Sequence, residues 1–157
     1  MLTEAVGYQW EKAVFGLSSE HRRMFRPMSR IAGIKKVIGE QVNLGWNPKT
    51  PHTKVGQELF ECVQSYLTEE EAQKLKLYCA IGTVLDLMHN TDGFFMIDNR
   101  ILPIDLKSGS LPPQYENGSF LLMQKECTGM SLWRSCLKIA RAFNPECKDK
   151  FIYTVDL

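Results

Sequence analysis

Two aspartates and a lysine are the residues of this sequence best placed to do chemistry together. Asp92 precedes one apolar stretch, Asp105 lies between Ile104 and Leu106 inside a second, and Lys107 follows two residues later. Charged residues are rare in buried strands unless they are paired or bind a metal. Two carboxylates that lie close together can hold a hard cation such as Mg²⁺. The three residues therefore form a candidate site.

A β-hairpin is the element that must bring these side chains together. A two-residue turn at 98–99 places Asp92 directly opposite Asp105, and Lys107 shares their face because side chains alternate along a strand. A turn at 99–100 places Asp92 opposite Lys107 instead, and a three-residue loop separates the cluster. The other face of the hairpin is expected to enter the core and carries only apolar residues: Phe95, Ile97, Leu102, Ile104 and Leu106.

The remaining pattern predicts an α/β (α+β) fold, with a small mixed β-sheet flanked by helices. We expect a single domain over 1–157, composed of a basic helical N-terminal region (1–46) and an α/β core (54–157), with a proline-containing break between them. Three helices are expected within 1–45, the third from Ser29 to about Val42. Two more helices are expected over 54–67 and from Thr68 to about Cys79, and a last helix from Thr128 to about Phe143. The expected strands are 81–88, 94–106 (the hairpin), 120–123 and 151–155.

Positive charge is concentrated near the N-terminus, although the net charge of the chain is only +1. Between His21 and Gly39 there is no acid, and six residues are basic: Arg22, Arg23, Arg26, Arg30, Lys35 and Lys36. Such a cluster attracts phosphate backbones. The alternative interpretation is a helix face that is simply solvated.

The hairpin residues resemble a known superfamily. Asp92, a gap of twelve residues and then Asp105-Leu106-Lys107 resemble the motif of the PD-(D/E)xK nucleases, with Thr91 where the family name has proline. The run continuing into Ser108-Gly109 is similar to the strand-end motif of the RecB-like members. The family core, with the restriction-endonuclease-like order of helix, three strands, helix and strand, is similar to the order expected over 54–157.

This resemblance implies Mg²⁺-dependent hydrolysis of DNA phosphodiester bonds, with Mn²⁺ as a substitute. Asp92 and Asp105 would hold the metal, and Lys107 would activate the attacking water and stabilise charge on the phosphate. A glutamate from the helix before the sheet often joins them. Glu58 and Glu61 are the candidates, and Glu58 lies nearer the apolar stripe of its helix. A member that cuts both strands of a duplex is expected to be a homodimer.

Composition sets the broader class. Hydrophobic residues make up 44% and charged residues 24% of the chain, which is typical of a globular protein. No apolar run reaches the roughly 18 residues of a membrane span, and no secretion signal is expected. The five cysteines are odd in number and include no Cys-x-x-Cys pair, which favours free thiols in the cytoplasm.

Two hypotheses for the function follow. The first is a small metal-dependent nuclease that acts on DNA. The second is a nuclease-like fold that binds nucleic acid or a protein partner without cutting. Asp86, on the strand expected at 81–88, is either a further acid beside the site or an ordinary strand-end residue.

Overall fold

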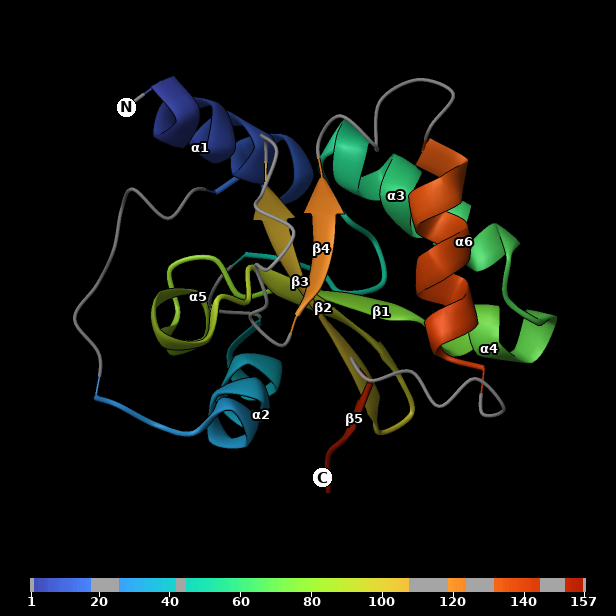
Figure 1. Ribbon diagram of the computed structural model, residues 1–157. Coiled ribbons are helices and arrows are strands. Elements are labelled where there is room, and N and C mark those ends of the chain that lie inside the picture. The colour runs from blue at the N-terminus through green and yellow to red at the C-terminus, as the bar shows by residue number, and fades with distance from the viewer. Residues whose placement is uncertain are drawn as a thin grey trace.

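The fold is a mixed sheet with helices on both faces. The computed structural model describes residues 2–17, 26–41, 45–107, 119–123, 132–144 and 152–156. Figure 1 shows the elements, which in chain order are α1 (Leu2–Phe15), α2 (Arg30–Glu40), α3 (Lys54–Ser65), α4 (Glu69–Lys74), β1 (Lys76–Cys79), α5 (Val84–His89), β2 (Gly93–Ile97), β3 (Arg100–Lys107), β4 (Phe120–Met123), α6 (Leu132–Ala142) and β5 (Tyr153–Thr154). The α/β class expected from the sequence is confirmed.

The sheet has the order β1-β2-β3-β4. Its first three strands are antiparallel, whereas β4 runs parallel to the end of β3. The short strand β5 pairs with the start of β3, through Arg100 and Ile101. The strand β3 therefore has β2 on one side and both β4 and β5 on the other, which makes it the centre of the sheet.

Two hydrophobic clusters cover the two faces of the sheet. The larger cluster packs α1, α3 and α6 against one face, through residues such as Phe15, Leu59 and Ile139. The smaller one packs α2 and α5 against the other face, through Ile34 and Leu85. The apolar hairpin face expected from the sequence lies in the larger cluster. Because α1 packs in the same core as the later elements, the N-terminal region contributes directly to the sheet domain.

Helix starts agree with the capping residues in the sequence. Ser29, Thr53 and Thr68 are N-caps, and each side chain accepts a hydrogen bond from a backbone N–H of its helix. The Thr68 hydroxyl also donates to the Glu71 carboxylate, at 3.1 Å. The pairing of Thr68 with Glu71 predicted from the sequence is thus present. The start of the last helix, expected at Thr128, lies outside the described residues, as do most of the second expected helix and the loop 108–118.

The first strand differs from the sequence prediction. The segment 81–88, expected to be a strand, contains the helix α5, and the strand β1 occupies Lys76–Cys79, where a helix was expected to continue. A turn explains the change, because Gly82 adopts a positive φ of 77° and Thr83 then caps α5. Both faces of β1 are covered, so its sequence lacks the alternation that identifies a half-buried strand.

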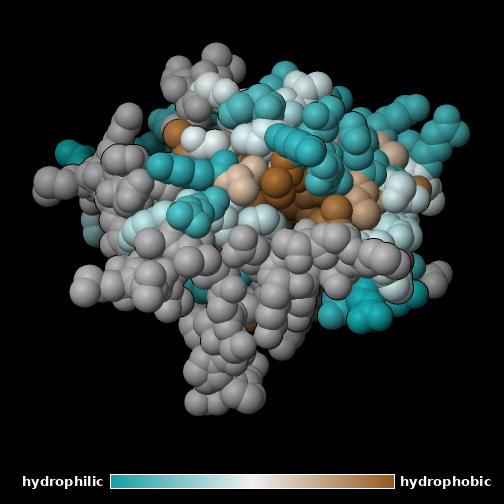
Figure 2. All heavy atoms as spheres, turned by 90° about the horizontal axis from the view of Figure 1, so that it is seen from above, coloured by the Kyte–Doolittle hydropathy of each residue, from teal (hydrophilic) through white to brown (hydrophobic). Residues whose placement is uncertain are grey.

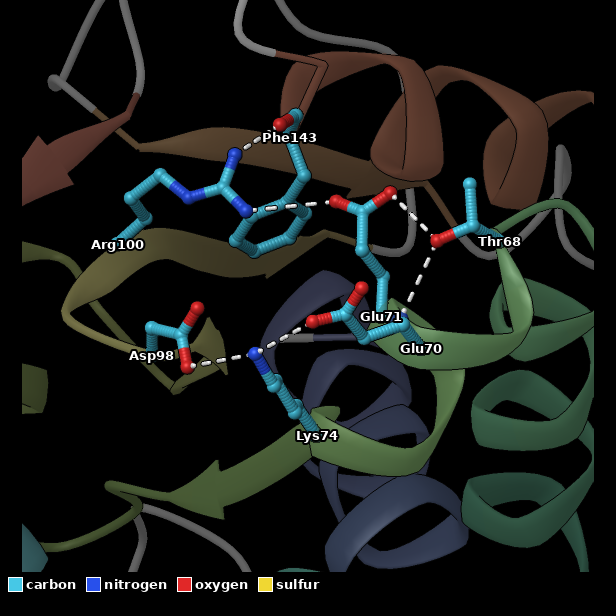
Figure 3. Close-up of polar contacts among 7 residues, drawn as sticks. All are labelled: Thr68, Glu70, Glu71, Lys74, Asp98, Arg100 and Phe143. Atoms are coloured by element: carbon cyan, nitrogen blue, oxygen red, sulfur yellow. Dashed lines mark hydrogen bonds and ion pairs between the residues drawn. The ribbon is translucent and has the colours of Figure 1, made fainter.

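A polar network fastens the hairpin turn to the helices at the opposite end of β3 from Lys107 (Figure 3). Arg100 bonds the Glu71 carboxylate at 3.3 Å and donates to the carbonyl of Phe143, just after α6. Lys74 pairs with Asp98 in the turn at 3.6 Å. These contacts hold the hairpin between α4 and α6, and so fix the direction in which its open end points.

The described surface is largely hydrophilic when seen from above, with hydrophobic residues gathered in one area near the middle (Figure 2). The large hydrophobic residues that are most exposed come from several elements: Leu17, Ile31, Tyr66, Met88 and Trp133.

Candidate functional site

The hairpin has the register predicted from the sequence. The turn is at Asp98-Asn99, since Ile97 pairs with Arg100. The ladder continues to the pair of Gly93 and Ile104, and the next N–H, that of Asp92, donates to the carbonyl of Ile104 at 2.9 Å. This hydrogen bond places Asp92 beside Ile104, next to Gly93, so the ladder becomes irregular at its open end. The direct pairing of Asp92 with Asp105 that the sequence predicted is not part of the ladder.

Asp92 is a buried acid surrounded by other acids. Its side chain is held by the backbone N–H of Leu106, which donates to Oδ2 at 2.7 Å. Burial raises the pKa of the Asp92 carboxyl well above its usual range, and the charges of Asp86, Asp105 and Glu11 raise it further. A hydrogen bond with Asp86 acts in the same direction. Ionisation of Asp92 is therefore costly unless a cation is nearby.

Three acids lie close enough together to share one cation. Glu11, Asp86 and Asp92 each offer a carboxylate oxygen within 4.8 Å of the others, in the part of the chain that the structure describes. They come from three elements, namely α1, α5 and the start of β2. Glu11 is only 6% exposed, and Gly82 donates its N–H to Asp86 at 2.9 Å. Asp86 therefore lies beside Asp92, which agrees with one of its two interpretations, although it is on a helix and not on a strand.

Asp105 and Lys107 form an ion pair beside this group. Lys107 Nζ lies 3.7 Å from Asp105 Oδ2, and the Asp105 side chain is only 4% exposed. The Lys107 side chain is partly exposed, with 34% of its surface accessible to solvent. The charge of Asp105 also contributes to the raised pKa of Asp92.

Glu11 is the acid that the sequence analysis missed. Neighbouring contacts fix its helix: Trp10 Nε1 donates to the carbonyl of Leu122 in β4 at 3.2 Å, and Phe15 packs on Gly93. A Cβ on Gly93 would lie 2.3 Å from Phe15 Cζ, so this close approach depends on glycine. The sequence contained one indication of its burial. Glu11 follows Trp10 and precedes Val14 by three residues, so it lies on the buried stripe of its helix.

The two glutamates proposed from the resemblance lie elsewhere. Glu58 and Glu61 are both exposed on α3, and neither belongs to the acid group of Glu11, Asp86 and Asp92. The helix that supplies a buried glutamate is α1. The resemblance points to a glutamate on the helix directly before the sheet, whereas Glu11 lies in the N-terminal region, before the basic segment.

The junction between α5 and β2 sets the spacing of Asp86 and Asp92. Asn90 ends the helix in the left-handed conformation, with φ of 51°, and its N–H bonds the carbonyl of Leu85. The buried Thr91 hydroxyl bonds the His89 carbonyl at 3.1 Å and lies 3.2 Å from the Ser119 hydroxyl. A short helix that turns back sharply into a strand thus points both acids to one place.

The basic residues expected to bind nucleic acid have different environments. Arg22 and Arg23 lie outside the described residues. Arg26, Lys35 and Lys36 are exposed. The guanidinium of Arg30, in contrast, is already used inside the molecule. It donates to the Tyr153 hydroxyl at 2.8 Å and to the His89 carbonyl at 3.0 Å.

Comparisons with family models, curated proteins and solved structures find no match to this chain. None of the helices in the described segments is both long enough and apolar enough to cross a bilayer.

Proposed function

We propose that this protein is a metal-dependent nuclease that hydrolyses DNA phosphodiester bonds. The observation that carries the proposal is the group of Glu11, Asp86 and Asp92, whose carboxylate oxygens converge within 4.8 Å at the open end of the hairpin. The ion pair of Asp105 and Lys107 lies beside them. Buried carboxylates and a lysine are the groups that phosphodiester hydrolysis needs.

The donor set fits a hard divalent cation. Oxygen ligands suit Mg²⁺ or Mn²⁺, and no thiol or imidazole belongs to the group. Burial and neighbouring negative charge raise the pKa of Asp92, and a bound cation would reverse that effect. Glu11, Asp86 and Asp92 would hold the ion, with Asp105 adjacent. When bound, such an ion lowers the pKa of its water and neutralises charge on a phosphate.

The protein groups have separate tasks in this proposal. The N–H of Leu106 fixes the orientation of the Asp92 carboxylate, because it donates to Oδ2 at 2.7 Å. Asp105 pairs with the ammonium of Lys107 at 3.7 Å, and the partly exposed Lys107 side chain would contact a phosphate oxygen. The positive charge of Lys107 then stabilises the extra negative charge that develops in the transition state.

The exposed cations of α2 and the segment before it would hold the DNA backbone. Arg26, Lys35 and Lys36 are the described residues that suit this role. We also propose a cytoplasmic location. The support is chemical, because Cys62, Cys79 and Cys136 are all free thiols, which a reducing compartment maintains.

A cleavage assay tests the proposal. Plasmid, linear duplex, single-stranded and branched DNA are incubated with the purified protein and Mg²⁺ or Mn²⁺. We expect cleavage of at least one substrate, lost on addition of EDTA and reduced about a hundredfold or more in Asp92→Asn and Asp105→Asn. Asp156→Asn, the same chemical change at an exposed position after β5, should cleave normally. Absence of cleavage by the wild type, or equal activity of all three variants, overturns the proposal.

A further inference from the structure

The helix α6 has an exposed face of unusual composition. Only four residues of Leu132–Ala142 are exposed, and they are Trp133, Arg134, Lys138 and Arg141. The helix contains no acidic residue. A solvated helix of a chain with a net charge of +1 normally mixes both signs, as α3 does with Lys54, Glu58 and Glu61. The face of α6 is purely cationic and aromatic.

The three cations Arg134, Lys138 and Arg141 all have exposed side chains. Within the described part of the chain, no acid lies within ion-pairing distance of Arg134, Lys138 or Arg141. Their spacing of four and three residues puts them on one side of the helix, over about 10 Å along its axis. One strand of duplex DNA places about three phosphates over that length, and an extended single strand places fewer.

The exposed Trp133 indicates which class of partner would bind this face of α6. Trp133 is 45% exposed, and the Arg134 guanidinium lies 5.5 Å from its ring centroid. Exposed aromatic rings flanked by cations are the groups on which unpaired bases stack. Insertion into a lipid surface does not fit, because the apolar side of α6, including Cys136 and Ile139, is packed in the core.

We propose that the exposed face of α6 binds single-stranded nucleic acid, with Arg134, Lys138 and Arg141 on the phosphates and Trp133 stacked on a base. The proposal rests on the proposed function for the class of partner. It adds a second binding surface, on the opposite side of the sheet from α2. An acidic polypeptide is the competing partner that the same charges could attract.

Binding is measured apart from cleavage, in EDTA, by the fluorescence anisotropy of a labelled oligo(dT) and of a duplex of equal length. We expect the double variant Arg134→Gln/Lys138→Gln to bind oligo(dT) about tenfold or more weakly and to reduce the slope of log K against log salt by about 1.4. The matched control Lys49→Gln/Lys54→Gln loses the same charge from exposed positions outside α6 and should bind like the wild type.

Substitutions of Trp133 distinguish the contribution of base stacking to binding from that of charge. Trp133→Ala should weaken oligo(dT) binding about fivefold or more and leave the salt slope unchanged, whereas Trp133→Phe should retain most of the affinity. Equal affinity of the α6 double variant and the control overturns the proposal. So does a preference for the duplex, or displacement of oligo(dT) by polyglutamate at an equal concentration of charge. If binding depends on α6 while no substrate is cleaved, only the nuclease proposal fails.

Discussion

Asp92 sits where the electrostatics of the site are unfavourable without a cation. Its folded-state pKa lies above the ordinary value of about 3.9 that it has in an unfolded chain. The folded protein therefore binds this proton more tightly than the unfolded protein does. The resulting contribution to stability is complete below about pH 4, and it is lost as the pH rises through the folded-state pKa.

A pH series on Asp92→Asn tests this cause. In EDTA, the free energy of unfolding of the wild type minus that of Asp92→Asn should fall as the pH rises from about 4 toward 8, because only the wild type must ionise a buried acid. The asparagine can still accept the hydrogen bond from Leu106. Urea denaturation at each pH supplies the values. A difference that stays constant with pH contradicts the burial of an ionisable acid at this position.

Lys107 is predicted to act mainly in the transition state. Lys107→Ala should lower turnover roughly a hundredfold at saturating DNA and Mg²⁺, because it removes charge stabilisation from the developing phosphorane. Binding of DNA and of the metal should change little. Single-turnover kinetics alongside anisotropy separate the two effects. Cleavage by Lys107→Ala at the wild-type rate would show that the ion pair with Asp105 is only structural.

At the scale of elements, Gly93 is the residue on which the docking of α1 depends. A Cβ there would lie 2.3 Å from Phe15 Cζ and 2.6 Å from the carbonyl oxygen of Tyr78 in β1, so either α1 or the strand pairing must shift. We expect Gly93→Ala to lower the free energy of unfolding by about 2–3 kcal/mol. Because α1 carries Glu11, metal binding should weaken in the same variant.

Gly39→Ala is the matched control for that substitution. Gly39 is an exposed residue of α2, and a Cβ there would meet no heavy atom within 4 Å. The change should stabilise the protein by about 0.5–1 kcal/mol, because alanine is the better helix former. Urea denaturation of both variants measures the contrast. Equal effects of the two changes would mean that the contact between Phe15 and Gly93 is not important.

Local signals predicted the hairpin well and β1 poorly. The turn at Asp98-Asn99 and the position of Asp105 within an apolar run determined the register, because a shift of one residue would have moved Asp105 to the face of Ile104 and Leu106. The strand β1 has no such alternation, because helices cover both of its faces. A short apolar run of this kind cannot be distinguished from a buried helix by its periodicity.

The acids of the site also differ in how well the sequence predicted them. Asp92 and Asp105 were predictable because one hairpin joins them. Glu11 and Asp86 reach the site through tertiary packing: the first on a helix separated from β2 by some eighty positions in the sequence, the second through the turn at Gly82. No local pattern encodes such a distance. The position of Glu11 on the apolar stripe of its helix was the one indication in the sequence. It indicates that this residue is buried, but it does not show which residues it contacts.

At the scale of the whole molecule, the acid group links the N-terminal helix to the sheet, so metal binding should be coupled to global stability. A ligand that binds only the folded state at a hundred times its Kd adds about 2.7 kcal/mol. For a chain of this size that corresponds to a rise in Tm of several degrees. We expect Mn²⁺ or Mg²⁺ to produce such a rise in the wild type, measured by differential scanning calorimetry with and without EDTA.

Two glutamate variants show whether α1 or α3 supplies the metal ligand. Glu11→Gln removes a carboxylate that lies within 4.8 Å of Asp86 and Asp92, so it should abolish most of the metal-induced rise in Tm. In EDTA the same variant should be at least as stable as the wild type, because a buried like charge is removed. Glu58→Gln makes the identical change on the exposed face of α3 and should keep the full rise. If Glu58→Gln loses the metal response and Glu11→Gln keeps it, the metal is bound through α3, and the site built around Glu11 is wrong.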